Sequence, residues 1–134
     1  MDKLFKENSI ILFQGDSITD CNRGRCNPAG LGDGYVNLIT EALADRYSHS
    51  NLKFVNRGMS GDKIRDLQLR WDEECIDIGP EILSILIGVN DTLSTPPELF
   101  EEEYRLLLKR TTDALSLKII LCEPFLLLGD NNAY

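Results

Sequence analysis

The residues S-I-I-L-F-Q-G-D-S-I-T-D, at positions 9–20, join a short apolar run to a polar turn. The run Ser9–Phe13 has the length and composition of a buried strand, and Gly15 permits a tight exit from it. Similar apolar runs follow at Leu52–Asn56, Ile82–Ile87 and Leu117–Cys122. Strands that are apolar throughout indicate a sheet that is buried on both faces.

The segments between these runs carry apolar residues at three- and four-residue spacing, which is the pattern of an amphipathic helix. They are Tyr35–Tyr47, Asp62–Ile78 and Pro97–Ala114. Strands that alternate with helices predict a parallel sheet with right-handed crossovers, and hence a three-layer α/β/α sandwich. We expect a single domain over residues 1–134, with ligands bound beyond the carboxyl ends of the strands.

The composition excludes several classes of protein. Of the 134 residues, 43% are hydrophobic, which is enough for one packed core. The formal net charge of -8 and the lack of a basic run exclude a nucleic-acid partner. Because neither a signal peptide nor a membrane-length apolar stretch is visible, the chain is expected to be cytoplasmic and without a membrane partner. Cys21 and Cys26 could pair, but reduced thiols are the expected state in that compartment.

Three polar loops follow the first three predicted strands. The G-D-S-I-T-D loop offers the hydroxyl of Ser17, and Asp16 can hold its turn through backbone amides. The N-R-G-M-S-G loop offers the backbone amide of Gly58, and the G-V-N-D loop offers the side-chain amide of Asn90. Each loop alone is more often an ordinary turn. Together they supply a nucleophile and the donors that acyl transfer needs where negative charge develops.

In this order and spacing, the motifs G-D-S-I-T-D, N-x-G-x-S-G and G-x-N-D resemble the first three blocks of the SGNH/GDSL hydrolases, and most of all the small branch of acetylxylan-esterase-like proteins and acylhydrolases. The similarity extends from about Ile10 to Gly129 and includes L-G-D-G-Y-V-N-L-I, R-D-L-Q-L-R-W-D-E-E-C and S-I-L-I-G-V-N-D-T. The resemblance implies a flavodoxin-like SGNH hydrolase fold. It also implies a serine ester hydrolase that acts on short-chain acyl or acetyl esters through an acyl-enzyme.

The resemblance further implies a role for residues of the three loops. Ser17 would be the nucleophile, and the backbone amides of Ser17 and Gly58 would form an oxyanion hole with the side chain of Asn90. Asp16 and Asp91, which adjoin these groups in the sequence, are expected to contact the substrate, a small-molecule or carbohydrate ester. The resemblance implies no metal and no organic cofactor.

One block of the family pattern is absent, the D-x-x-H motif that supplies the general base and its orienting Asp. The chain is therefore expected to be C-terminally truncated, to lack the last strand and helix of the family fold, and to be inactive alone. The only histidine, His49, is predicted in a turn at the end of the sheet opposite Ser17. A non-catalytic small-ligand-binding α/β module is the alternative. A nucleotide-binding or receiver domain is disfavoured, because a Walker-type Lys-Ser/Thr and an adjacent acid pair are lacking.

The last predicted strand, Leu117–Cys122, would lie at the edge of the sheet. Its unpaired backbone groups would offer a template for another chain. The apolar residues Phe125–Leu128 follow closely, and burying one such side chain stabilises a fold by roughly 1.5 to 3 kcal/mol. We therefore expect this edge to be covered, either by a second copy in a homo-oligomer or by an associated C-terminal fragment.

Overall fold

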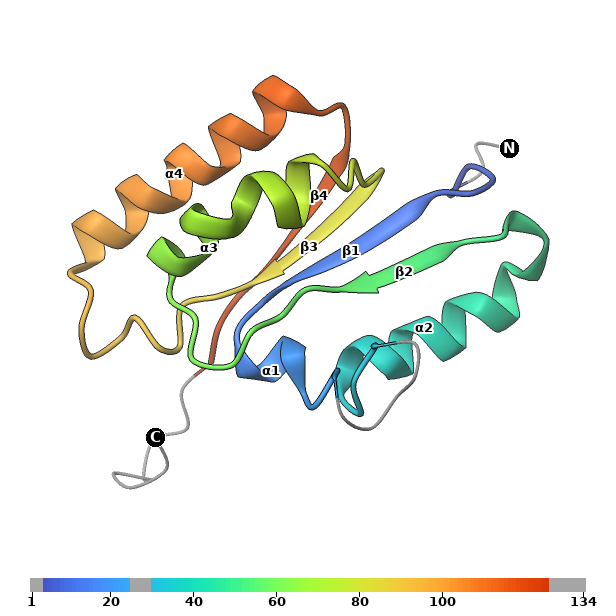
Figure 1. The fold of residues 1–134 in the computed structure, drawn as a ribbon, viewed down its shortest axis with the longest axis horizontal. Helices are drawn as coiled ribbons and strands as arrows, with labels where there is room; N and C mark the ends of the chain where they lie inside the picture. The colour runs from blue at the N-terminus through green and yellow to red at the C-terminus, as the bar shows by residue number, and fades with distance from the viewer. Residues whose placement is uncertain (1–3, 25–29, 126–134) are drawn as a thin grey trace.

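The computed structural model of the chain describes residues 4–24 and 30–125 (Figure 1). In chain order, its elements are β1 (Ile10–Gly15), α1 (Ser17–Asp20), α2 (Tyr35–Arg46), the 3-10 turn η1 (Ser48–Ser50), β2 (Lys53–Asn56), α3 (Ile64–Trp71), the π-helical turn η2 (Asp72–Ile76), β3 (Ile82–Leu86), α4 (Pro97–Ala114) and β4 (Lys118–Cys122). The predicted α/β fold and its order of strands and long helices are confirmed. Within the described residues, no helix is both long and apolar enough to cross a membrane.

The four strands form one parallel sheet in the order β2-β1-β3-β4. Leu12 of β1 pairs with Val55 on one side and with Leu83 on the other, and its side chain is fully buried. The chain passes from β1 to β2 on one side, and then crosses back to β3 on the other side. Loops that leave β1 and β3 therefore diverge at the carboxyl ends of these strands, which is where open α/β sheets bind ligands.

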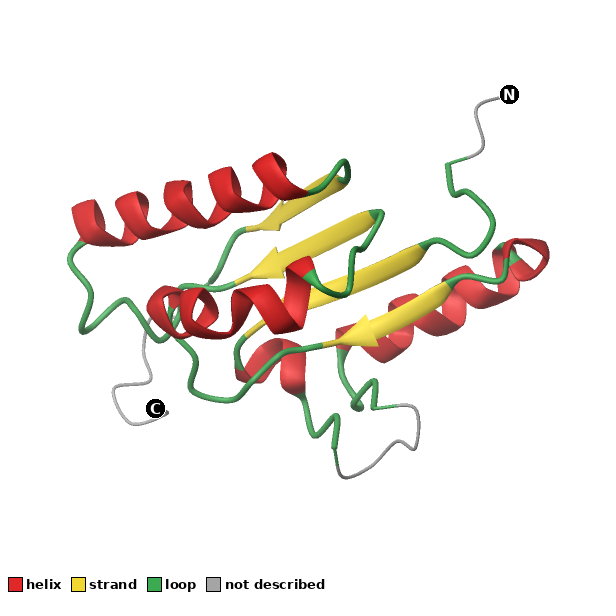
Figure 2. Ribbon diagram, turned by 45° about the horizontal axis from the view of Figure 1, so that its top comes forward, coloured by secondary structure: helices red, strands yellow, loops and turns green. Residues whose placement is uncertain are grey.

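Helices cover both faces of the sheet, with α3 and α4 on one face and α2 on the other (Figure 2). Side chains of β1 pack against the helices on both faces, because successive residues of a strand point to opposite faces. Leu12 packs in the cluster with α3 and α4, whereas Ile11 and Phe13 pack in the cluster with α2. The fully buried Trp71 donates from Nε1 to Thr111 Oγ1 at 2.9 Å, which joins α3 to α4.

Two helical details differ from the sequence prediction. The helix predicted over Asp62–Ile78 begins only at Ile64, and its last turn, Asp72–Ile76, is π-helical. The loop predicted after β1 contains the short helix α1, in which the Asp16 carboxylate accepts a hydrogen bond from the Ile18 N–H at 3.0 Å. Four residues are too few to show a helical period, so only the capping residue could have revealed α1.

Strand β4 lies at the edge of the sheet, as predicted. Ile120 and Leu121 are each 53% exposed, and Phe125 is 59% exposed. The remaining apolar residues of the predicted patch, 126–128, lie outside the described residues. The predicted association of a second copy or a C-terminal fragment with this edge stays a prediction.

Candidate active site

The predicted nucleophile, Ser17, is the first residue of α1 and directly follows the turn that ends β1. Its side chain is exposed, whereas the neighbouring Asp16 is only 1% exposed and caps the helix. A backbone N–H in the first turn of a helix has no partner within the helix. Ser17 therefore presents a hydroxyl, and a backbone N–H without a partner within the helix, at the carboxyl end of a central strand.

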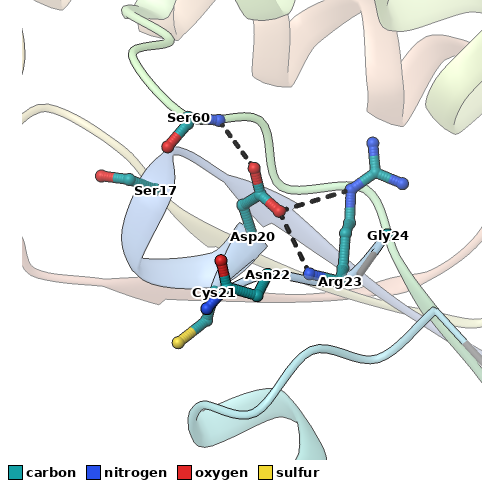
Figure 3. A pocket seen from close by; sticks show the side chains of 7 residues that line it. All are labelled: Ser17, Asp20, Cys21, Asn22, Arg23, Gly24 and Ser60. Carbon is teal, nitrogen blue, oxygen red and sulfur yellow. Dashed lines mark hydrogen bonds and ion pairs between the residues drawn. The ribbon is translucent and has the colours of Figure 1, made fainter. Parts of the chain in front are cut away.

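A polar pocket of about 650 Å³ opens beside Ser17 (Figure 3). The residues that line it are Ser17, Asp20, Cys21, Asn22, Arg23, Gly24 and Ser60. Asp20 holds the second loop against α1, because its carboxylate accepts from the Ser60 N–H at 3.0 Å. The same carboxylate accepts from the Arg23 N–H at 3.3 Å. Figure 3 shows both serines on the same side of Asp20.

Gly58, the predicted backbone donor of the second loop, is buried against α1. Its N–H donates to the side-chain oxygen of Asn56 at 2.9 Å, and its carbonyl accepts from Arg23 Nε at 2.7 Å. Asn56 in turn donates to the carbonyl of Thr19 at 2.7 Å and to that of Leu31 at 3.0 Å. The Gly58 N–H would have to share or leave its bond to Asn56 before it could stabilise an oxyanion.

Asn90, the predicted donor of the third loop, is half-buried, and its side-chain amide already makes one hydrogen bond. Its Nδ2 donates to the backbone carbonyl of Asp62 at 3.0 Å. A side-chain amide carries two N–H groups, so this bond fixes the orientation of the amide and leaves the second N–H available. The third loop therefore retains a donor that a bound oxyanion could use.

The two carboxylates predicted to contact the substrate face the protein interior instead. Asp91 is 3% exposed, and its oxygens accept from the Ile64 N–H at 3.0 Å and from Thr95 Oγ1 at 2.8 Å. Asp16 is still more buried and caps α1. Both side chains therefore position the loops of the site, and their burial argues against direct contact with a substrate.

The electrostatics of Asp16 show that the three loops adjoin one another. Burial is the main cause that raises the pKa of the Asp16 carboxyl above its ordinary value, and the negative charges of Asp62 and Asp91 raise it further. The hydrogen bond from the Ile18 N–H acts in the opposite direction. Carboxylates from the second and third loops thus lie close enough to act on the first.

Replacing Asp16 with asparagine is expected to change how stability depends on pH. A carboxyl with a raised pKa binds more protons in the folded state than in the unfolded state. Its contribution to the free energy of unfolding therefore falls as pH rises from its ordinary pKa of about 3.9 through its raised pKa in the folded protein. Asparagine keeps the oxygen that caps α1 but does not ionise. The stability of Asp16→Asn relative to the unmodified chain should therefore rise with pH. Urea unfolding at several pH values between about 4 and 8 measures this, and a constant difference would contradict it.

His49 lies far from these loops. It belongs to η1, is exposed, and precedes β2 at the amino end of the sheet, as the sequence predicts. In the described part of the chain, no group of three or more His, Cys, Asp or Glu residues is placed to hold a metal ion. Cys21, Cys75 and Cys122 are free thiols, and Cys26 lies outside the described residues.

Sequence reasoning missed two residues that organise the site, Asn56 and Asp62. Asn56 is 1% exposed and bonds to three backbone groups, which ties the second loop to α1. Asp62 supplies the carbonyl that orients Asn90. Asn56 stands inside the N-x-G-x-S-G motif, so the motif itself was the available signal. Nothing local marks Asp62 as part of the site.

Comparison with known proteins agrees with this geometry. The model of the GDSL-like lipase/acylhydrolase family matches residues 13–134. The chain belongs to this family. It is 37% identical to the acetylxylan esterase of Geobacillus stearothermophilus, over 90% of this chain and 61% of that protein. The predicted family is therefore confirmed.

Solved structures show the same relationship. A GDSL-like lipase from Parabacteroides merdae superposes with a TM-score of 0.86 at 42% identity, over 92% of this chain and 62% of that one. A catalytic mutant of the Geobacillus acetylxylan esterase gives a TM-score of 0.82 at 33% identity, over 97% and 66%. The chain thus spans about three fifths of the length of these relatives. The structures of that esterase include catalytic mutants with alanine in place of a serine, an aspartate or a histidine.

Proposed function

We propose that this chain supplies the nucleophile and the oxyanion-stabilising loops of a serine ester hydrolase that acts on short-chain acyl or acetyl esters. The observation that carries the proposal is the position of Ser17, exposed at the start of α1 beside a polar pocket. Membership of the GDSL-like lipase/acylhydrolase family supports the reaction class. The name of the Geobacillus relative supports an acetylated carbohydrate as substrate.

The reaction begins when Ser17 Oγ forms a bond to the ester carbonyl carbon and gives its proton to a general base. The electron pair of the C=O bond moves to oxygen, and the Ser17 N–H and the free N–H of Asn90 stabilise the oxyanion. As the C=O bond re-forms, the bond to the alcohol oxygen breaks and that oxygen takes the proton. Water then attacks the acyl-enzyme and releases the acid and Ser17.

The general base is not supplied by the histidine of this chain. His49 lies at the opposite end of the sheet from Ser17 and is preceded three residues earlier by Arg46, so it does not belong to a D-x-x-H motif. We propose that the base and its orienting carboxylate come from a segment outside these residues. Without them, hydrolysis should be slower by about 10⁴- to 10⁶-fold, as in enzymes that lose a triad member.

The polar lining of the pocket supports a substrate rich in hydroxyl groups. Asp20 and Asn22 offer oxygen acceptors and amide donors, and Ser60 of the second loop offers a hydroxyl. Such groups can pair with the hydroxyls of a sugar, whereas a long acyl chain would need an apolar lining. We therefore propose a short acyl group on a carbohydrate or similar polar alcohol.

Covalent labelling tests the nucleophile. The test protein is a chimera in which the C-terminal part of the Geobacillus esterase, which carries the missing motif, follows Gly129 of this chain. After treatment with a serine-directed phosphonate, mass spectrometry should place the adduct on Ser17. Ser17→Ala should abolish both the adduct and the hydrolysis of p-nitrophenyl acetate. Ser60→Ala, which removes the other serine of the same pocket, should retain the adduct; labelling of Ser60 in place of Ser17 would refute the assignment.

A non-catalytic ligand-binding module is the second candidate, because the position of His49 leaves Ser17 without a base from this chain. The chimera separates the two candidates. Restored hydrolysis supports the esterase, whereas binding of an acetylated xylo-oligosaccharide without turnover, in a folded chimera, supports the binding module.

A further inference from the structure

Arg70 of α3 lies beneath the three loops, and its side chain is only 14% exposed. We propose that Arg70 is a positioning residue that fixes the relative placement of Ser17, the Gly58 loop and Asn90. The proposal rests on the function proposed above for these loops. It assigns no contact between Arg70 and the substrate, because the side chain is mostly buried and its guanidinium is bonded to Gln14, Gly15, Arg57 and Asp62.

The guanidinium binds the first two loops at the points where they leave the sheet. Its Nη1 donates to the side-chain oxygen of Gln14 at 3.0 Å and to the carbonyl of Arg57 at 2.8 Å. Its Nη2 lies 3.4 Å from the carbonyl of Gly15. Gly15 immediately precedes the nucleophile turn, and Arg57 immediately precedes Gly58. One planar group therefore sets the distance between the ends of β1 and β2.

The same guanidinium reaches the third loop through Asp62. Nε and Nη2 of Arg70 each lie 2.8 Å from Asp62 Oδ2. The backbone carbonyl of Asp62 accepts the hydrogen bond from Asn90 Nδ2 that orients this amide. A shift of Asp62 would therefore turn the Asn90 donor, although Arg70 itself does not touch Asn90.

The number and direction of these bonds require arginine. A guanidinium presents five N–H donors in a rigid plane, whereas the ammonium of lysine presents three donors from one point. The hydrogen-bond acceptors around Arg70 are two backbone carbonyls, an amide oxygen and the Asp62 carboxylate, and a second carboxylate, Glu74 Oε2, lies 3.8 Å from Nη1. Lysine could keep the charge beside Asp62 but could not reach all of these acceptors together.

Nuclear magnetic resonance of the chain as it stands tests the inference without enzymatic activity. Arg70→Lys is expected to shift the side-chain NH₂ signals of Asn90 and the backbone amide signals of Ser17 and Gly58 together, with faster hydrogen exchange at Asn90. Arg110→Lys is the matched control. Arg110 also binds an amide and a carboxylate, since Nη1 lies 2.8 Å from Gln68 Oε1 and Nη2 lies 2.6 Å from Asp72 Oδ1. These bonds join α4 to α3 and involve none of the three loops.

The outcomes distinguish positioning from general support of the fold. If Arg110→Lys lowers the melting temperature as much as Arg70→Lys does but leaves the three signals in place, the positioning role is supported. If Arg70→Lys moves only the signals of its direct neighbours, or moves Asn90 no more than Arg110→Lys does, the inference is overturned. Should Arg70→Lys fail to fold, Asp62→Asn is the second variant, because it keeps the shape and backbone of Asp62. An unchanged side-chain signal of Asn90 in Asp62→Asn would also overturn the inference. A failure of Ser17 labelling in the chimera would refute the proposed esterase and leave these signals unaffected.

Discussion

Asn90→Ala is expected to lower kcat of the chimera by about 10²- to 10³-fold, as the loss of one oxyanion donor does in other acyl-transfer enzymes. The reason is that the amide of Asn90 keeps one N–H free, while its bond to the Asp62 carbonyl holds that N–H in a fixed direction. A donor held in place in the free enzyme costs no reorganisation when the oxyanion forms. KM should change little, since the interaction strengthens only in the transition state.

Steady-state kinetics with p-nitrophenyl acetate measures this effect, and thermal unfolding provides the control for stability. Loss of the single hydrogen bond to Asp62 should reduce the free energy of unfolding by only about 0.5 to 1.5 kcal/mol. Asn90→Asp is the sharper comparison, because it keeps the size of the side chain but places a negative charge where the oxyanion develops. An Asn90→Ala protein with normal kcat would show that Asn90 is only a turn residue.

Local pattern was sufficient to predict the sheet. The strand Ile82–Leu86 is buried at every position, and its sequence is apolar except for Ser84, so its pattern predicts a strand between two helices. The helix Pro97–Ala114 was predicted with both ends correct, because its proline start and its apolar period are strong signals. The short helix α1 has neither signal, although it carries Ser17.

The inner layer of the site could not be predicted in this way. Asp16 and Asp91 are polar residues in loops, and nothing in their immediate sequence states that they point inward. Arg70 and Gln14 are 56 positions apart in the sequence, and their hydrogen bond exists only because α3 packs beneath the ends of the strands. Contacts of this kind depend on the tertiary fold. The resemblance to a family pointed to the loops that carry the chemistry, but not to the residues that hold those loops together.

Gly58→Ala is expected to impair both stability and catalysis, for a reason that differs from that for Asn90. A Cβ atom at this position would overlap the backbone nitrogen of Asp20 and lie 2.7 Å from the carbonyl carbon of Thr19. These atoms belong to the backbone of α1 and its end, so they cannot rotate away, and the loop and α1 must move apart. Such overpacking costs about 1 to 3 kcal/mol, which a fold with a typical margin of about 5 to 15 kcal/mol can survive.

The displacement should cost more in activity than in stability. Because α1 carries Ser17, a shift of the loop from α1 by about 1 Å can lower kcat on the order of 10²-fold while the protein stays folded. Gly24→Ala is the matched control: Gly24 lines the same pocket, and a Cβ there would meet no atom of the described residues within 4 Å. Kinetics and urea unfolding of both variants in the chimera measure the difference. If Gly58→Ala behaved like Gly24→Ala in both measurements, the close packing of the second loop against α1 would not be what holds Ser17 in place.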